Sequence, residues 1–137
     1  MRFLISLLLL VGLLCNAAPM NAGDHRWEEI DRNDRMIIYR SLDTDRTTPL
    51  RYDQRVMLRV DYLVPDRIVV GEDTYLISHR FVRGVMVCSN RTAIAEEEFI
   101  FEYPSTALLD HVTTRKVYTI MTGSPLDKIW SLSCTQK

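Results

Sequence analysis

The sequence lacks the short motifs that identify the commonest enzyme sites. It contains no G-x-S-x-G nucleophile motif, no phosphate-binding P-loop and no dinucleotide-binding glycine fingerprint. Its three histidines, His25, His79 and His111, have no second histidine or cysteine three or four residues further on, a spacing that zinc sites often use. We therefore expect no catalytic residue, no cofactor site and no metal site, and we expect that the protein is not an enzyme.

One acidic cluster could be interpreted as a catalytic carboxylate pair. Glu96, Glu97 and Glu98 follow one another, and two of them would share a face of a strand, as the paired carboxylates of a glycosidase can. Nothing else in the sequence marks a cleft around them. An exposed, charged strand is the better interpretation.

The chain also lacks an apolar run long enough to cross a bilayer. Its longest run, from Phe3 to Cys15, has about 12 apolar residues, where a spanning helix needs about 20. Arg2 precedes this run and the small residues 16–18 follow it, an arrangement typical of a secretory signal peptide. The expected organisation is a signal peptide over residues 1–17, a flexible leader over residues 18–24 and a single domain over residues 25–137.

Cys15 offers an alternative to ordinary cleavage. In a bacterial lipoprotein signal, small residues stand directly before the cysteine that receives the lipid. Leu13 and Leu14 occupy those positions here. The sequence therefore favours cleavage after Ala17 or Ala18, without a lipid.

Neither sign of charge dominates the composition. There are 17 basic and 18 acidic residues, and because Arg2 belongs to the signal peptide, 16 basic residues remain against 18 acidic ones, a formal charge of −2. General nucleic-acid binders carry a net basic face. We expect no nucleic-acid partner, and no membrane insertion once the signal peptide is removed.

Cysteine is scarce, and its placement is informative. Outside the signal peptide only Cys88 and Cys134 remain, 46 residues apart. Exported proteins reach an oxidising compartment in which disulfides persist. The sequence therefore predicts a disulfide between Cys88 and Cys134, with a structural role for both residues.

The domain reads as a series of strands. Residues 26–42 predict a hairpin that turns at Asn33 and Asp34, and the alternation over residues 55–64 predicts a strand that Pro65-Asp66 ends. In the strand that follows Asn90, we expect Phe99 on one face and both Ile94 and Ile100 on the other. Further strands are expected at residues 67–70, 74–88 (with a bend or bulge at Gly84), 92–103 and 115–121, and a long loop at residues 43–54.

The tail predicts a short helix. Ser124 is a suitable N-cap, Pro125 suits the first helical position and Asp127 completes a capping-box pattern. Leu126, Ile129, Trp130 and Ser133 then recur at helical spacing, with Cys134 on the same side. We expect Trp130 to anchor this helix in the core.

In this order, the features resemble the bacterial surface-adhesin protein E family. The resemblance covers residues 27–134 and rests on Trp27 at the first strand, "IIYR", "RVMLRVDYLV", "YLISHRFVRGVMVCSNR" and the terminal "GSPLDKIWSLSC". The family usually has tyrosine-tyrosine-aspartate after the first hairpin, whereas this chain has Tyr39-Arg40, and its loop from Asp43 to Gln54 is longer. We therefore carry over no binding residues.

The resemblance implies a small antiparallel sheet with a C-terminal helix, exported to the bacterial envelope. Its best-known member is a lipoprotein adhesin that binds host proteins such as vitronectin and laminin. We accordingly expect an α+β fold, an antiparallel meander of about six strands with one C-terminal helix and one disulfide, in the periplasm or on the outer cell surface. The expected function is non-enzymatic, adhesin-like binding of a protein partner such as a host matrix or serum protein.

Two other interpretations stay open. The first is a periplasmic inhibitor or immunity protein that blocks a hydrolase, since small exported disulfide-bonded sheets suit that role equally well. The second is an uncharacterised enzyme. The sequence leaves the identity of the partner and the formation of a homodimer undecided.

Overall fold

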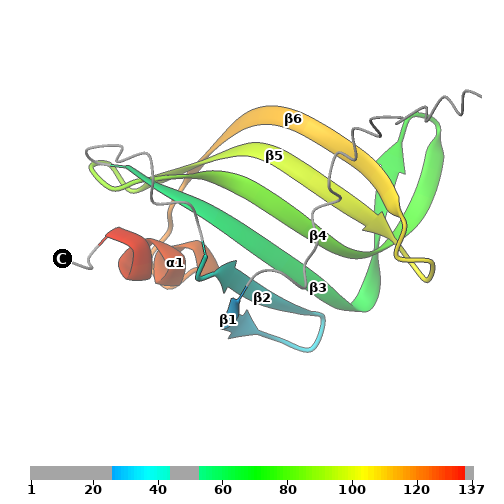
Figure 1. The fold of residues 1–137 in the computed structure, drawn as a ribbon, viewed down its shortest axis with the longest axis horizontal. Helices are drawn as coiled ribbons and strands as arrows, with labels where there is room; N and C mark the ends of the chain where they lie inside the picture. Colours follow the sequence, from blue (N-terminus) through cyan, green and yellow to red (C-terminus); the bar gives the residue numbers. More distant parts are fainter. Residues whose placement is uncertain (1–25, 44–52, 135–137) are drawn as a thin grey trace, which may run out of the picture.

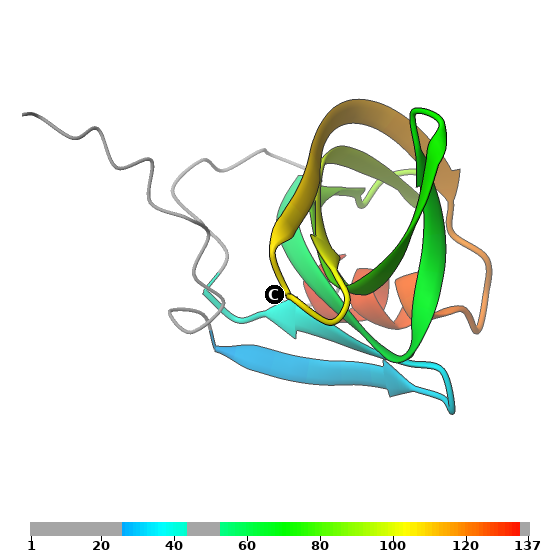
Figure 2. The same cartoon turned by 90° about the vertical axis from the view of Figure 1, so that its right-hand side faces the viewer.

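The structure, a computed structural model, describes residues 26–43 and 53–134. The strands form one antiparallel sheet whose order follows the sequence, from β1 at one edge to β6 at the other (Figure 1). Seen from its end, the sheet is strongly curved (Figure 2). The elements are β1 (Trp27–Arg32), β2 (Met36–Ser41), β3 (Asp53–Val70), β4 (Asp73–Val87), β5 (Thr92–Glu102), β6 (Leu108–Thr119) and α1 (Pro125–Cys134).

The described part of the chain is therefore mostly β, and the predicted six-stranded antiparallel meander with a C-terminal helix is confirmed. The predicted signal peptide over residues 1–17, the leader over residues 18–24 and Cys15 lie outside the described residues, as does most of the predicted loop at residues 43–54. At the end of that loop, Asp53 and Gln54 belong to β3.

The first hairpin forms where the sequence predicts it. The side-chain oxygen of Asn33 accepts hydrogen bonds from the backbone N–H groups of Arg35 (2.8 Å) and Met36 (2.9 Å), which closes the turn. An asparagine that bonds to the backbone two residues further on is a standard way to build such a turn. Trp27 then pairs with Ser41 at the open end of the hairpin.

The prediction that Pro65-Asp66 ends a strand is wrong, because β3 continues to Val70. The pairing with β4 is interrupted between Asp61 and Asp66 and then resumes. Proline has no N–H to give to a ladder, so it is tolerated at such an interruption. The N–H groups of Leu63 and Val64 instead reach the carbonyl of Arg35 in the first hairpin.

Gly84 is the site of the predicted irregularity, and the bulge is confirmed. The pairing of β4 with β5 shifts between Arg83 and Gly84, which leaves Glu96 as an extra residue on β5. A Cβ on Gly84 would lie 2.2 Å from the carbonyl oxygen of Ile94, so only glycine fits this close backbone approach.

The bulge also corrects the predicted faces of β5. Directly paired residues point to the same side of a sheet. Ile94 pairs with Val85 and Phe99 pairs with Phe81, two positions on one side of β4, whereas Ile100 pairs with Arg80 on the other side. Ile94 therefore shares its face with Phe99, because the extra residue reverses the alternation between them.

The last strand is longer than predicted. It begins at Leu108 and ends at Thr119, whereas the sequence suggested residues 115–121. Pairing with β5, from Phe101 opposite Leu108 to Thr92 opposite Thr119, draws residues 108–114 into the sheet as well.

Helix α1 packs on one side of the sheet, which we call the helix face, and the opposite side is the outer face. The buried centre of the helix-face core consists of Met86, Ala93, Ile120 and Ile129. Partly buried apolar side chains from β1, β2 and β3 complete it: Ile30, Ile38, Val56 and Leu58. This core joins residues from five strands to the helix, which ties the β1–β2 hairpin to the rest of the sheet.

Candidate functional site

The start of α1 is held by a variant of the predicted capping box. The Ser124 hydroxyl accepts a hydrogen bond from the backbone N–H of Asp127 (3.2 Å). The carboxylate of Asp127 reaches back to the N–H of Gly123 (2.8 Å) and also accepts from Arg91. The Gly123 N–H and then Arg91 lower the pKa of Asp127 below its ordinary value. A charged carboxylate at a helix N-terminus is favourable.

The end of α1 is held by the predicted disulfide. Cys88 follows β4 and Cys134 is the last residue of α1, and their Cα atoms are 5.4 Å apart with the sulfurs bonded at 2.06 Å. These two cysteines are the site residues that the sequence predicted, and they lie together. The bond fixes the helix to the sheet and provides no reactive thiol.

The predicted apolar face of α1 packs against the sheet as expected, although its most buried residue is Ile129 and not Trp130. Ile129 is 0% exposed, whereas Trp130 is only partly buried. The Arg91 guanidinium lies over the indole ring at 4.6 Å, a cation–π arrangement. The indole Nε1 is buried without a hydrogen-bond partner among the described residues. Ile129 is therefore the main anchor of the helix, and the expectation placed on Trp130 is corrected to a supporting contact.

The two edges of the sheet differ strongly. β1 is a six-residue strand of mostly charged side chains, a common protection against unwanted pairing. β6 has twelve residues and pairs with β5 on one side only, with no strand on its other side in the described part of the chain. Its C-terminal end exposes Val117 (61%) and Tyr118, and Met121 just beyond is also exposed.

Some backbone N–H and C=O groups of β6 point away from β5, toward the open edge of the sheet. The N–H of Ile120 donates to the carbonyl of Arg91 at 2.9 Å, which makes these two residues a hydrogen-bonded pair. In an antiparallel ladder such pairs alternate with pairs whose N–H and C=O groups point away from the partner. Thr119 and Val117 occupy the alternate positions, opposite Thr92 and Ile94, so their backbone groups face away from β5.

The outer face carries an aromatic cluster. His79 stacks on Phe101 with ring centroids 4.3 Å apart, and Phe81 meets both rings edge-on. Trp27 reaches Phe81 from β1, with ring centroids 5.6 Å apart. Burial, and secondarily the positive charge of Arg59, lowers the pKa of His79 below its ordinary value of 6.5. The cluster therefore favours a neutral imidazole.

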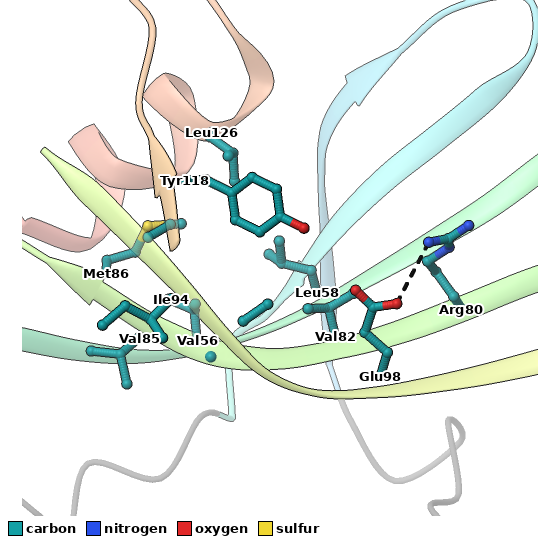
Figure 3. Close-up of a pocket in the computed structure, with 13 residues that line it drawn as sticks. Val56, Leu58, Arg80, Val82, Val85, Met86, Ile94, Glu98, Tyr118 and Leu126 are labelled. Atoms are coloured by element: carbon teal, nitrogen blue, oxygen red, sulfur yellow. Dashed lines mark ion pairs between the residues drawn. The ribbon is translucent and has the colours of Figure 1, made fainter. Parts of the chain in front are cut away.

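The helix face contains a pocket of about 210 Å³ beside α1 (Figure 3). We call it the helix-face pocket. Its wall is largely apolar and includes Val56, Leu58, Val82, Met86, Tyr118 and Leu126. One end is polar, where Arg80 and Glu98 form an ion pair with a nitrogen–oxygen distance of 3.7 Å.

The three consecutive glutamates do not form a carboxylate pair. Glu96 lies near Arg55 (3.7 Å), Glu97 near Arg83 (3.2 Å), and Glu98 joins the helix-face pocket. Each is therefore part of a separate ion pair with an arginine, as expected of charged strand positions.

The histidines also lie apart from any metal-like cluster. His79 belongs to the aromatic cluster, and His111 stacks on Phe99 with ring centroids 4.2 Å apart. His25 lies outside the described residues. Within residues 26–43 and 53–134, no three His, Cys, Asp or Glu side chains gather in a way that could hold a metal ion.

The sequence did not reveal the helix-face pocket or the open edge. Arg80 and Glu98 are eighteen positions apart, and only the pairing of β4 with β5 brings them together. No local pattern marks either residue. The edge character of β6 likewise depends on the order of all six strands.

Comparisons with known proteins give no relative: no family model, no curated protein and no solved structure matches the chain. The described residues include no helix with the length and apolar character needed to cross a membrane.

Proposed function

We propose that the protein is an exported, non-enzymatic protein of the bacterial envelope that binds another protein through the open edge of β6. The observation that carries this proposal is a twelve-residue edge strand with outward backbone groups and exposed apolar side chains at its end. An extended segment of a partner would add to β6 as a further strand, a recurring mode of peptide recognition.

The contrast with β1 makes β6 the preferred edge. Proteins usually blunt an edge strand by making it short or charged. The charged β1 follows this practice, whereas β6 exposes the apolar Val117 and Tyr118 near its C-terminal end. Exposed apolar side chains beside free backbone groups offer both affinity and specificity to a strand partner.

The side chains of β6 also define the partner's chemistry. Arg115 and Lys116 are exposed and stand directly before the apolar Val117 and Tyr118. A complementary segment would carry acidic residues opposite the basic pair and apolar residues next to them. Such a charge match mainly increases the rate and the selectivity of association.

Export is supported by the disulfide and by the N-terminal sequence. A bond between Cys88 and Cys134 would persist in the periplasm or on the cell surface. The resemblance to the surface-adhesin protein E family favours a host matrix or serum protein as the partner.

The test compares two matched substitutions of exposed valines in the purified exported protein, Val117→Glu on β6 and Val69→Glu on the β3–β4 hairpin. Val69 is 68% exposed and pairs only within that hairpin. Binding to immobilised vitronectin and laminin is measured by interferometry. We expect binding to at least one of them, weakened about tenfold or more by Val117→Glu, as for a central interface residue, and unchanged by Val69→Glu. Failure to bind either protein, or equal binding by all three chains, would contradict the proposal.

The inhibitor interpretation has one observation in its favour. Residues 73–76, at the start of β4, have no register partner on β5. Here β3 and β4 pair only with each other and form a two-stranded arm that ends at the turn at Gly71 (Figure 1). The arm exposes Val69 and Leu76, and a narrow apolar arm can enter the cleft of a hydrolase. If the protein instead inhibits a periplasmic hydrolase, Val69→Glu should abolish inhibition and Val117→Glu should leave it intact.

A further inference from the structure

We propose that the helix-face pocket binds a small, neutral phenol, a single aromatic ring that carries a hydroxyl group. This inference goes beyond the proposed function, because the pocket lies on the helix face of the sheet and takes a small molecule instead of a protein segment. Its basis is the size of the pocket, its apolar wall and the polar pair at one end.

The size of the pocket sets the size of the ligand. Its volume of about 210 Å³ is below the range of about 300–1,000 Å³ that drug-sized ligands need. An apolar cavity of about 150 Å³ is known to hold one benzene molecule. The helix-face pocket therefore suits one ring with a few additional atoms.

Small residues create this space, and larger ones border it. Gly84, Ala93 and Ala95 contribute little side-chain volume where β4 and β5 line the pocket. Tyr118, from β6, and Leu126, from α1, stand across the pocket from Val56 on β3 and Val82 on β4 (Figure 3). A flat ring can lie between these two walls and exchange water for apolar contacts.

The polar end has unused hydrogen-bonding capacity. The side chains of Arg80 and Glu98 are 24% and 12% exposed, and their closest nitrogen and oxygen are 3.7 Å apart, too far for a direct hydrogen bond. The Nε of Arg80 is buried and has no partner among the described residues. Buried polar groups in proteins are nearly always paired.

A hydroxyl group matches this arrangement better than a charged group does. One hydroxyl oxygen placed between the two side chains can accept from Arg80 and donate to Glu98. The two charges sum to zero, so a carboxylate would meet repulsion from Glu98 and an ammonium group would meet repulsion from Arg80. The geometry therefore selects a neutral donor–acceptor.

The experiment titrates three ring compounds of similar size into the exported protein, with amide chemical shifts as the readout. The probes are p-cresol, toluene and 4-methylbenzoate, which place a hydroxyl, a methyl alone or a carboxylate at the polar end. We expect p-cresol to shift the amides of Leu58, Val82 and Met86. It should bind about tenfold or more tightly than toluene, the value of one hydrogen bond to a charged group, and more tightly than 4-methylbenzoate.

Two carboxylate variants sharpen the test. Glu98→Gln removes the negative charge beside Arg80, so 4-methylbenzoate should gain affinity relative to p-cresol. Glu97→Gln is the matched control, because Glu97 lies on the outer face and pairs with Arg83; it should leave the order of the three probes unchanged. Toluene binding as tightly as p-cresol, shifts confined to other residues, or no shifts at millimolar concentration would each overturn the proposal. If Glu98→Gln does not fold, the relative affinities of the three probes for the unaltered protein are sufficient to test the proposal.

Discussion

Ile129 is the residue whose packing holds α1 on the sheet. It is fully buried against Met86, Ala93 and Ile120, whereas Lys128, one position earlier, is exposed and pairs with Asp31. Truncating a buried isoleucine removes apolar contacts and leaves a cavity, at a cost of about 2–5 kcal/mol. An exposed ion pair contributes about 0–1 kcal/mol.

We therefore expect Ile129→Ala to lower the free energy of unfolding by about 2–5 kcal/mol and Lys128→Ala to lower it by no more than about 1 kcal/mol. Urea denaturation of both oxidised variants measures the difference. Equal midpoints would mean that α1 does not pack as described.

His79 links stability to pH through its burial in the aromatic cluster. Because its pKa is lowered in the folded state, the unfolded chain binds more protons between the folded value and the ordinary 6.5. Stability should therefore be complete above pH 6.5 and decline as the pH falls through this range. We expect His79→Gln to reduce this decline in a series of melting temperatures from pH 7.5 to pH 5. Parallel curves for the variant and the unaltered protein would show that other groups cause the pH dependence.

Among the elements, α1 depends most on its covalent bond. Ten residues form too short a helix to be stable alone in water. The disulfide closes a loop over 46 residues, and the chain-entropy model gives it about 4 kcal/mol. We expect a Cys88→Ala, Cys134→Ala double variant to lose up to this amount and to undock α1 before the sheet opens.

Trypsin offers a direct readout of that undocking, because Lys128 lies within α1. The oxidised protein should resist cleavage at Lys128, and the double variant should be cut there while β3 to β5 stay intact. Equal resistance of both proteins would show that packing alone holds the helix.

The sequence predicted the elements whose signals are local. The alternation of apolar and polar residues predicted the first hairpin and the strand from residue 55, and the pattern from Ser124 to Cys134 predicted the helix. These patterns are visible in the sequence because they involve residues only a few positions apart. The errors arose where pairing overrides local pattern. The ladder with β4 carries β3 past Pro65, and the extra residue at Glu96 moves Ile94 to the other face.

The two surfaces that we propose for function depend on contacts distant in sequence. Arg80 and Glu98 meet only after β4 and β5 align, in the register that pairs Arg80 with Ile100 and Val82 with Glu98. The outward groups of Val117 and Thr119 follow from the ladder with β5. The local sequence around these residues predicts neither the polar end of the pocket nor the outward backbone groups of β6.

At the scale of the whole molecule, the two edge strands of the sheet differ in length and charge, and only one face of the sheet carries the helix. The β1 edge is short and charged, while β6 has no strand beside its outer edge among residues 26–43 and 53–134. A strand added to β6 would extend the sheet without disturbing the helix-face core or the disulfide. Partner binding through β6 is therefore compatible with a rigid domain.

Hydrogen exchange at β6 tests this central claim most directly. In the free protein, the amides of Val117 and Thr119 should exchange quickly, whereas that of Tyr118 should be protected by its pairing with Ala93. Addition of the bound partner, vitronectin or laminin, should protect Val117 and Thr119 selectively and leave the β1 amides unchanged. Unchanged exchange at Val117 and Thr119 in the saturated complex would contradict strand addition at β6.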